Sequence, residues 1–145
     1  MDGSALEQVA FARLTIEPKL AELAARNLTP DLIARLEAID DSVDAAIRKA
    51  DIPGYLAANH AFHFALYEAA DAPILLDMAR SMWLRFGPSL RIVCERGGAA
   101  SLPDRHAEAL AAMAAGDAAG LARAIQNDIQ QGVDQIREAQ AQGDV

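Results

Sequence analysis

Aromatic residues, cysteine and basic residues are all scarce in this sequence. Aromatic side chains make up 5% of its 145 residues, although 52% of the residues are hydrophobic and alanine dominates that apolar fraction. Alanine favours closely packed helices, whereas sheets are usually built from β-branched and aromatic residues. The composition therefore predicts an all-α protein, and the length fits one domain over residues 1–145 with a complete hydrophobic core.

The scarcity of cysteine bears on where the protein works. Cys94 is the only cysteine, so the chain has no internal disulfide and no cysteine cluster for a metal, which fits a reducing compartment. The sequence also lacks an amino-terminal signal segment and any apolar run near the ~20 residues of a membrane span. We expect a cytoplasmic protein with no membrane partner.

Basic residues are outnumbered by acidic ones, 13 to 21, so the formal net charge is −8 and the isoelectric point is about 4.7. Binding to the phosphates of a nucleic acid needs a basic surface. The composition therefore argues against a chain that clamps DNA or RNA by itself, and any contact with DNA has to come from elsewhere.

Apolar residues spaced three and four apart predict helices along the chain. We expect them over residues 6–26, 30–50, 53–71 and from 73, then, after a loop at 97–103, over about 103–115 and 117–139. Pro18 in the first helix and Pro88 in the fourth, which follows Gly87, each predict a kink or a break. Four charged residues of the second helix are expected on its solvated face: Asp40, Asp41, Asp44 and Arg48.

The third helix carries polar residues on its apolar face. Asn59 and His63 are four residues apart, so they lie on one stripe of an α-helix among apolar side chains. A buried imidazole and a buried amide are costly unless they are hydrogen-bonded or coordinate something. One interpretation is a core histidine that is satisfied by its asparagine neighbour, and the other is a binding site. His60 points about 100° away from its neighbour Asn59 on an α-helix, so we expect it to lie outside such a site.

A second histidine is placed by the last two helices. The short connection at 116–117 predicts an antiparallel hairpin. His106 lies ten residues before this turn and Asp128 eleven after it, so both are ~15–17 Å from the turn and can face each other. Together with Asn59 and His63 they would offer two nitrogens and two oxygens to a divalent metal ion. The alternative is that His106 caps or pairs near its helix start while Asp128 is solvated.

A small carboxylate is the ligand that such a site favours, because Asp128 alone leaves a divalent ion with about one excess positive charge. Arg13 and Glu17, four residues apart, are typical of a surface ion pair, although an arginine that points into a pocket has the same spacing. Between residues 80 and 105, five arginines stand against two acidic residues. They are either solvated or line an anion pocket, since a planar guanidinium suits a carboxylate. Arg80 and Arg85 are the candidates on the fourth helix.

These stretches together resemble the FCD domain, the C-terminal effector-binding domain of FadR-type regulators in the GntR family, across nearly the whole chain. The resemblance is carried, in order, by RLTIEPKLAELAA, NHAFHFALYEAADAPIL, MWLRFGP and RHAEALAAMAAGDAAGLARAIQNDI. It implies an FCD-like antiparallel bundle of six to seven helices, often dimeric, with a central pocket that holds a metal such as zinc or nickel in many members.

The metal-binding pattern of this family is an aspartate, a histidine four residues on, a histidine near the start of the next-to-last helix and another histidine twenty-two residues later. By resemblance, these positions are Asn59, His63, His106 and Asp128. The first is an amide here and the last a carboxylate, which leaves room for a harder or more weakly held ion, or for none. Arg13 matches an arginine that reaches the pocket in similar domains.

The leading prediction is therefore a sensing domain and not an enzyme. It would bind a small organic acid through a metal ion and through Arg13, Arg80 or Arg85, and it would form a homodimer. Similar regulators carry a winged helix-turn-helix before this domain, and we expect this chain to lack it, so that DNA is bound only through that separate part. The alternatives are a metal-dependent enzyme on the same scaffold and a purely structural dimerisation domain with both histidines in its core.

Overall fold

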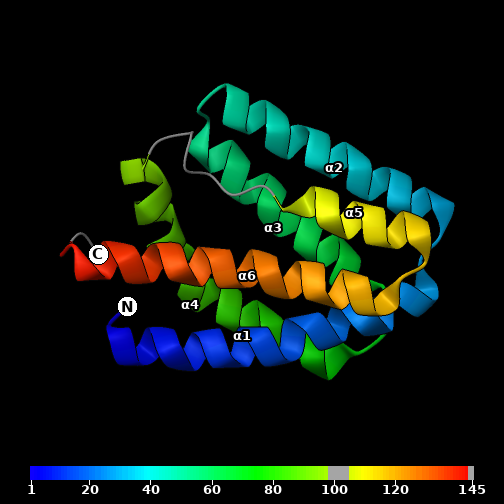
Figure 1. Cartoon of the computed structure of the whole chain (residues 1–145), viewed down its shortest axis with the longest axis horizontal. Helices are drawn as coiled ribbons and strands as arrows, with labels where there is room; N and C mark the ends of the chain where they lie inside the picture. Colours follow the sequence, from blue (N-terminus) through cyan, green and yellow to red (C-terminus); the bar gives the residue numbers. More distant parts are fainter. Residues whose placement is uncertain (98–104, 144–145) are drawn as a thin grey trace.

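The computed structural model describes residues 1–97 and 105–143, which form a bundle of six α-helices and one short 3₁₀ helix (Figure 1). The elements are α1 (Gly3–Ala24), η1 (Ala25–Asn27), α2 (Pro30–Arg48), α3 (Ile52–Glu68), α4 (Pro73–Gly97), α5 (His106–Ala115) and α6 (Ala118–Ala141). Each α-helix runs opposite to the one before it, so the start of α1 and the end of α6 lie at the same end of the bundle. The predicted all-α antiparallel bundle is confirmed. No helix in the described ranges is long and apolar enough to cross a membrane.

The helix boundaries follow local capping chemistry. The side chains of Asp2, Thr29, Asp51 and Asp117 each accept a backbone N–H at the start of a helix, which satisfies a donor that has no partner within the helix. α5 ends at Gly116, whose φ of 66° is left-handed and favours glycine. The loop and the helix start that the sequence places at residues 98–104 lie outside the described residues, and α5 is described from His106 onward.

Neither internal proline divides its helix. α1 continues through Pro18 and α4 continues through Pro88, so a break is wrong at both positions. A proline removes one backbone hydrogen bond, and the packing of a helix on its neighbours can hold the remaining turns in place. In Figure 1 the last part of α4 turns away from the line of its first part, as a helix kinked at proline does.

The second half of α3 is buried on all sides. The helix packs against α1, α2 and α4, and its run Phe62–Tyr67 is buried without interruption. The apolar stripe predicted on α6 is also buried: Leu121, Ile125, Ile129, Val133 and Ile136. Because the core is otherwise apolar, the polar side chains that α1, α3, α5 and α6 direct into it need partners there.

Candidate metal and effector site

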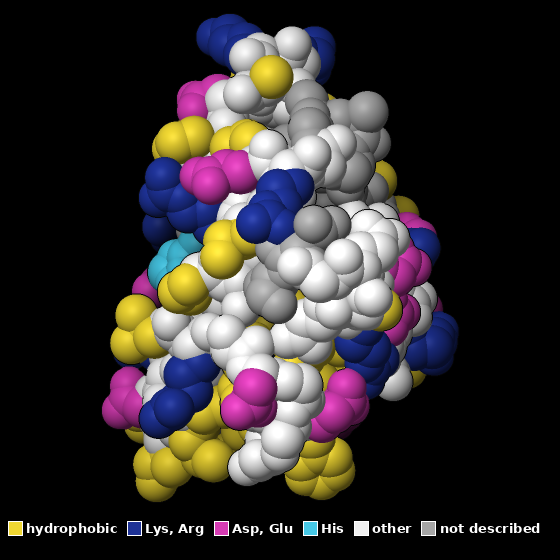
Figure 2. All heavy atoms as spheres, turned by 90° about the vertical axis from the view of Figure 1, so that its left-hand side faces the viewer, with side chains coloured by type: hydrophobic (Ala, Val, Ile, Leu, Met, Phe, Trp, Pro, Cys, Tyr) yellow, Lys and Arg dark blue, Asp and Glu magenta, His cyan; other side chains and the backbone are white. Residues whose placement is uncertain are grey.

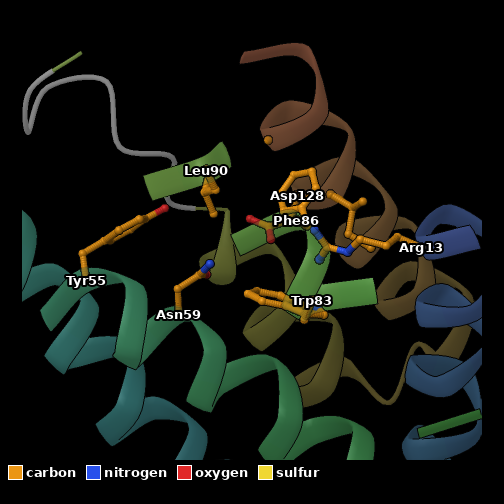
Figure 3. Close-up of a pocket in the computed structure, with 9 residues that line it drawn as sticks. Arg13, Tyr55, Asn59, Trp83, Phe86, Leu90 and Asp128 are labelled. Atoms are coloured by element: carbon orange, nitrogen blue, oxygen red, sulfur yellow. The ribbon is translucent and has the colours of Figure 1, made fainter. Parts of the chain in front are cut away.

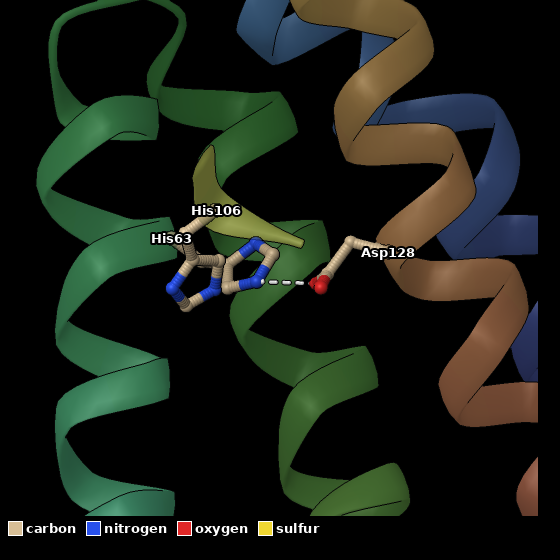
Figure 4. Close-up of side chains that lie close together, drawn as sticks. All are labelled: His63, His106 and Asp128. Atoms are coloured by element: carbon tan, nitrogen blue, oxygen red, sulfur yellow. Dashed lines mark ion pairs between the residues drawn. The ribbon is translucent and has the colours of Figure 1, made fainter. Parts of the chain in front are cut away.

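Two histidines and an aspartate converge in the core of the bundle. His63 on α3, His106 at the first position of α5 and Asp128 on α6 each offer one ligand atom, and these atoms all lie within 4.8 Å of one another (Figure 4). Both imidazoles are buried, with 0% and 1% of their surface exposed. The structure thus places His106 and Asp128 opposite each other, as the register of the hairpin predicts.

The contact between His63 and Asp128 is short but poorly aligned. Nε2 of His63 lies 2.8 Å from Oδ2 of Asp128, yet among the described residues this nitrogen has no partner in hydrogen-bond geometry. Burial raises the pKa of Asp128, but the contact with His63 and the charges of His63, His106 and Arg13 outweigh burial and hold that pKa below its usual value. A carboxylate and an imidazole nitrogen that converge without an aligned hydrogen bond fit a shared metal ion.

Asp40 is a hydrogen-bond partner of the second histidine, His106. Oδ1 of Asp40, on α2, lies 2.9 Å from Nδ1 of His106, whose ring stacks on Phe62 with centroids 4.0 Å apart. The prediction that Asp40 is solvated is wrong, because it is buried. Asp40 lies four residues after Leu36 and three before Val43, on the apolar face of α2, so the sequence already indicated that it is buried. A carboxylate on Nδ1 directs Nε2 toward a metal, as is common for metal-bound histidines.

Glu17 is the centre of a buried hydrogen-bond cluster. Its Oε1 accepts hydrogen bonds from the Arg13 guanidinium at 3.1 Å, and from the Tyr67 hydroxyl and the Trp83 indole at 2.8 Å each. The guanidinium also lies between two aromatic rings, 4.4 Å from the centroids of Trp83 and Phe86. The interpretation of Arg13 and Glu17 as a surface ion pair is therefore wrong, since both side chains are in the core.

A small cavity adjoins the cluster of His63, His106 and Asp128 (Figure 3). Its volume is about 20 Å³, which is room for roughly one water molecule. It is lined by Arg13, Tyr55, Asn59, Trp83, Phe86, Leu90, Asp128, Ile129 and Gly132. Asp128 belongs to both the cavity and the cluster, and Asn59 is buried with its side chain directed toward the cavity. Asn59 and Arg13 thus lie beside the three converging residues and line the same cavity as Asp128.

Comparison with known proteins identifies the family. The sequence profile of the FCD domain matches residues 8–131, which is most of the chain. The chain belongs to the FCD family of GntR-type regulators. The resemblance carried by its motifs is therefore confirmed.

This FCD domain is similar to a bacterial transcriptional regulator. It is 30% identical, over 132 residues, to the HTH-type transcriptional regulator McbR of Escherichia coli K12, and the match covers 88% of this chain and 59% of that protein. The chain thus spans somewhat more than half the length of this relative. The solved structure of E. coli McbR/YncC agrees with a TM-score of 0.89 at 27% identity, covering 94% of this chain and 70% of that one.

The other two arginines predicted as ligand contacts lie elsewhere in the FCD domain. Arg80 is 48% exposed and pairs with Asp77 and Glu68, and Arg85 is also exposed. Neither is among the described residues that line the central cavity. Arg80 instead borders a hollow on the surface between α3 and α4, together with His60. His60 thus lies outside the cluster, as its position on the helix predicts.

Sequence reasoning missed two partners in the core of the FCD domain. Tyr67 stands four residues after His63, as His63 stands four after Asn59, so one polar stripe continues along α3. That continuation is a signal that could have been used. Trp83 carried no comparable signal, because a tryptophan on an apolar helix face is expected in any core, and only the tertiary structure brings its indole N–H to Glu17.

Proposed function

We propose that this FCD domain is the effector-sensing part of a transcriptional regulator, and that it binds a divalent metal ion through His63, His106 and Asp128. The observation that carries the proposal is the convergence of these three ligands in the core, around a His63 nitrogen with no aligned partner in the described structure. Asn59 can add an amide oxygen. Two imidazoles with one or two oxygens suit zinc or nickel, with a harder or more weakly held ion as the alternative.

The buried charges support a divalent cation. Three carboxylates, those of Asp128, Asp40 and Glu17, stand against the single guanidinium of Arg13. When both imidazoles are neutral, as metal ligands must be, two negative charges are left in and around the core. Uncompensated buried charge is strongly unfavourable, and one divalent ion neutralises it. Counting Asp128 alone gave a divalent ion one excess positive charge; with Glu17, Asp40 and Arg13 included, we propose a site close to neutral.

We propose a small organic acid as the effector. With the site near neutrality, its carboxylate would be held by direct coordination to the ion and by the donors of Arg13 that face away from Glu17. The cavity has room for about one water, so the effector must displace some of the side chains that line it. Trp83, Phe86 and Leu90 form its wall on α4. An effector that moves α4 would give the domain a way to pass a signal on.

Trp83 makes this proposal measurable, because it is the only tryptophan of the chain and lines the cavity. The metal content of protein purified without chelator or a nickel column is measured first. Small organic acids are then titrated into metal-loaded and metal-free protein, with tryptophan fluorescence and calorimetry as readouts. We expect bound metal, and an acid that shifts the fluorescence only when metal is present. Protein that takes up no added divalent ion, neither zinc or nickel nor a harder one, would refute the metal site.

The same titration distinguishes the proposed sensing domain from two other functions. A metal-dependent enzyme would consume one of the acids over time, whereas a sensing domain returns it unchanged, and we propose the latter. A purely structural dimerisation domain would bind neither metal nor acid. The regulator similarity and the family resemblance favour sensing, and we further propose a homodimer, which sedimentation or light scattering tests.

We place DNA binding of the full regulator in a separate winged helix-turn-helix. This FCD domain has a net charge of −8, and on the face in Figure 2 acidic, basic and apolar side chains are interspersed and no continuous basic surface is visible. Phosphate binding requires such a basic surface. Salt-sensitive binding of duplex DNA to residues 1–145 at micromolar concentration would contradict this assignment.

A further inference from the structure

A chain of buried hydrogen bonds ends on one of the metal-site histidines. Oε1 of Glu17 on α1 lies 2.8 Å from the hydroxyl oxygen of Tyr67 on α3, and that oxygen lies 2.9 Å from Nδ1 of His63. All three side chains are fully buried. Each hydrogen position in the chain therefore follows from which groups can donate and which can only accept.

The hydroxyl of Tyr67 has one hydrogen, which it donates in a hydrogen bond to Glu17. The carboxylate of Glu17, paired with Arg13, can only accept. A phenol carries its hydrogen at neutral pH, and with an acceptor-only carboxylate 2.8 Å away the Tyr67 hydroxyl donates that hydrogen to Glu17. The Tyr67 oxygen is then left as an acceptor toward His63, and the hydrogen in that bond must come from Nδ1 of the imidazole.

We propose that Tyr67 is a positioning residue, which fixes His63 with its hydrogen on Nδ1 and leaves the lone pair of Nε2 to face Asp128. The use of that lone pair by a metal ion rests on the proposed function, whereas the tautomer does not. Without this constraint the hydrogen of a neutral His63 can lie on either ring nitrogen, and the negative charge of Asp128, 2.8 Å from Nε2, favours Nε2. Tyr67 therefore holds the ring in the tautomer that a metal needs, against the pull of a nearby carboxylate.

The tautomer is tested without metal by nitrogen NMR of histidine-labelled protein, in which the signal of each ring nitrogen reports whether it carries the hydrogen. In the wild-type protein we expect His63 to carry its hydrogen on Nδ1. In Tyr67→Phe we expect the hydrogen to move to Nε2. His106, whose Nδ1 is held by Asp40, should be unchanged and is the internal control. A wild-type His63 with its hydrogen on Nε2 overturns the proposal, even where the Tyr67→Phe variant does not fold.

Metal affinity supplies the second readout, by competition with a chelator for zinc. Loss of an outer hydrogen-bond partner of a metal ligand typically weakens affinity about 10- to 100-fold, and we expect this for folded Tyr67→Phe. The matched control is Cys94→Ala, which also removes one buried heavy atom, on α4 and outside the cluster, and should bind zinc as the wild type does. Equal affinity in the two variants overturns the role of Tyr67. Absence of zinc binding in the wild type would refute the proposed function, while the tautomer would still be decided by NMR.

Discussion

Arg13 and Glu17 form an ion pair inside the core, with 3% and 0% of their side chains exposed. Lys19 and Glu22 pair on the same helix at nearly the same spacing, but with 51% and 42% exposed. Removing one member of a buried pair leaves an uncompensated charge and typically costs about 3–5 kcal/mol. An exposed pair is worth about 0–1 kcal/mol, because water screens it.

Arg13→Gln should therefore lower the free energy of unfolding by about 3–5 kcal/mol, and Lys19→Gln by less than about 1 kcal/mol. Urea denaturation of metal-free protein, with both variants measured under the same conditions, provides the comparison. Similar losses in the two variants would mean that water reaches Arg13 in solution.

The contribution of Arg13 to effector binding needs a gentler substitution. Arg13→Lys keeps a cation beside Glu17 but loses the planar fork of donors that can hold a second carboxylate. A charge-assisted hydrogen bond is worth roughly 1.5–3 kcal/mol, so the variant should lose about one to two decades of affinity for the organic acid. Calorimetry measures this. Unchanged affinity would place Arg13 outside the effector contacts.

Replacing either buried histidine should abolish most metal binding. His63→Ala and His106→Ala each remove one of the converging ligands. The control is His60→Ala, which removes an exposed ring from α3, the helix of His63. Metal at 100 times its dissociation constant should stabilise the wild type by about 2.7 kcal/mol. Thermal denaturation with and without metal should show this gain in wild type and His60→Ala only. Full metal content in both of the other variants would show that His63 and His106 do not share a site.

Asp40 should affect metal affinity, although it contacts the ligand His106 and is not itself one of the proposed metal ligands. Asp40→Ala removes the acceptor that orients His106, and we expect metal affinity to fall about 10- to 100-fold. Its neighbour Asp41 is exposed, so Asp41→Ala should bind metal normally. Chelator competition on both proteins makes the test, and equal affinities would assign Asp40 a structural role alone.

The thiol of Cys94 should be inert in the folded protein. Burial, with a smaller effect of Glu95, raises its pKa to about 11, and only the thiolate reacts. A disulfide reagent at pH 8 should label it only after denaturant is added. Since the unfolded chain ionises this thiol more readily, its contribution to stability falls as the pH rises above about 9. Rapid labelling without denaturant would show that α4 opens locally.

The helices and one part of the site could be predicted from the sequence because their geometry is local. A 3.6-residue period and capping side chains such as Thr29 and Asp117 define where helices start and which face is apolar. A two-residue turn then sets the register of the last hairpin, so His106 and Asp128 could be placed opposite each other from spacing alone.

Only the tertiary structure decides which polar side chains are hydrogen-bond partners in the core. Arg91 and Glu95 have the same spacing as Arg13 and Glu17, yet both are exposed, so spacing does not reveal which pair is buried. Glu17 is in the core because α3 and α4 cover its face of α1, bringing in hydrogen-bond donors from 50 and 66 residues away in the chain. No local pattern encodes contacts at such separations, because they depend on how whole helices pack and not on the residues next to Glu17.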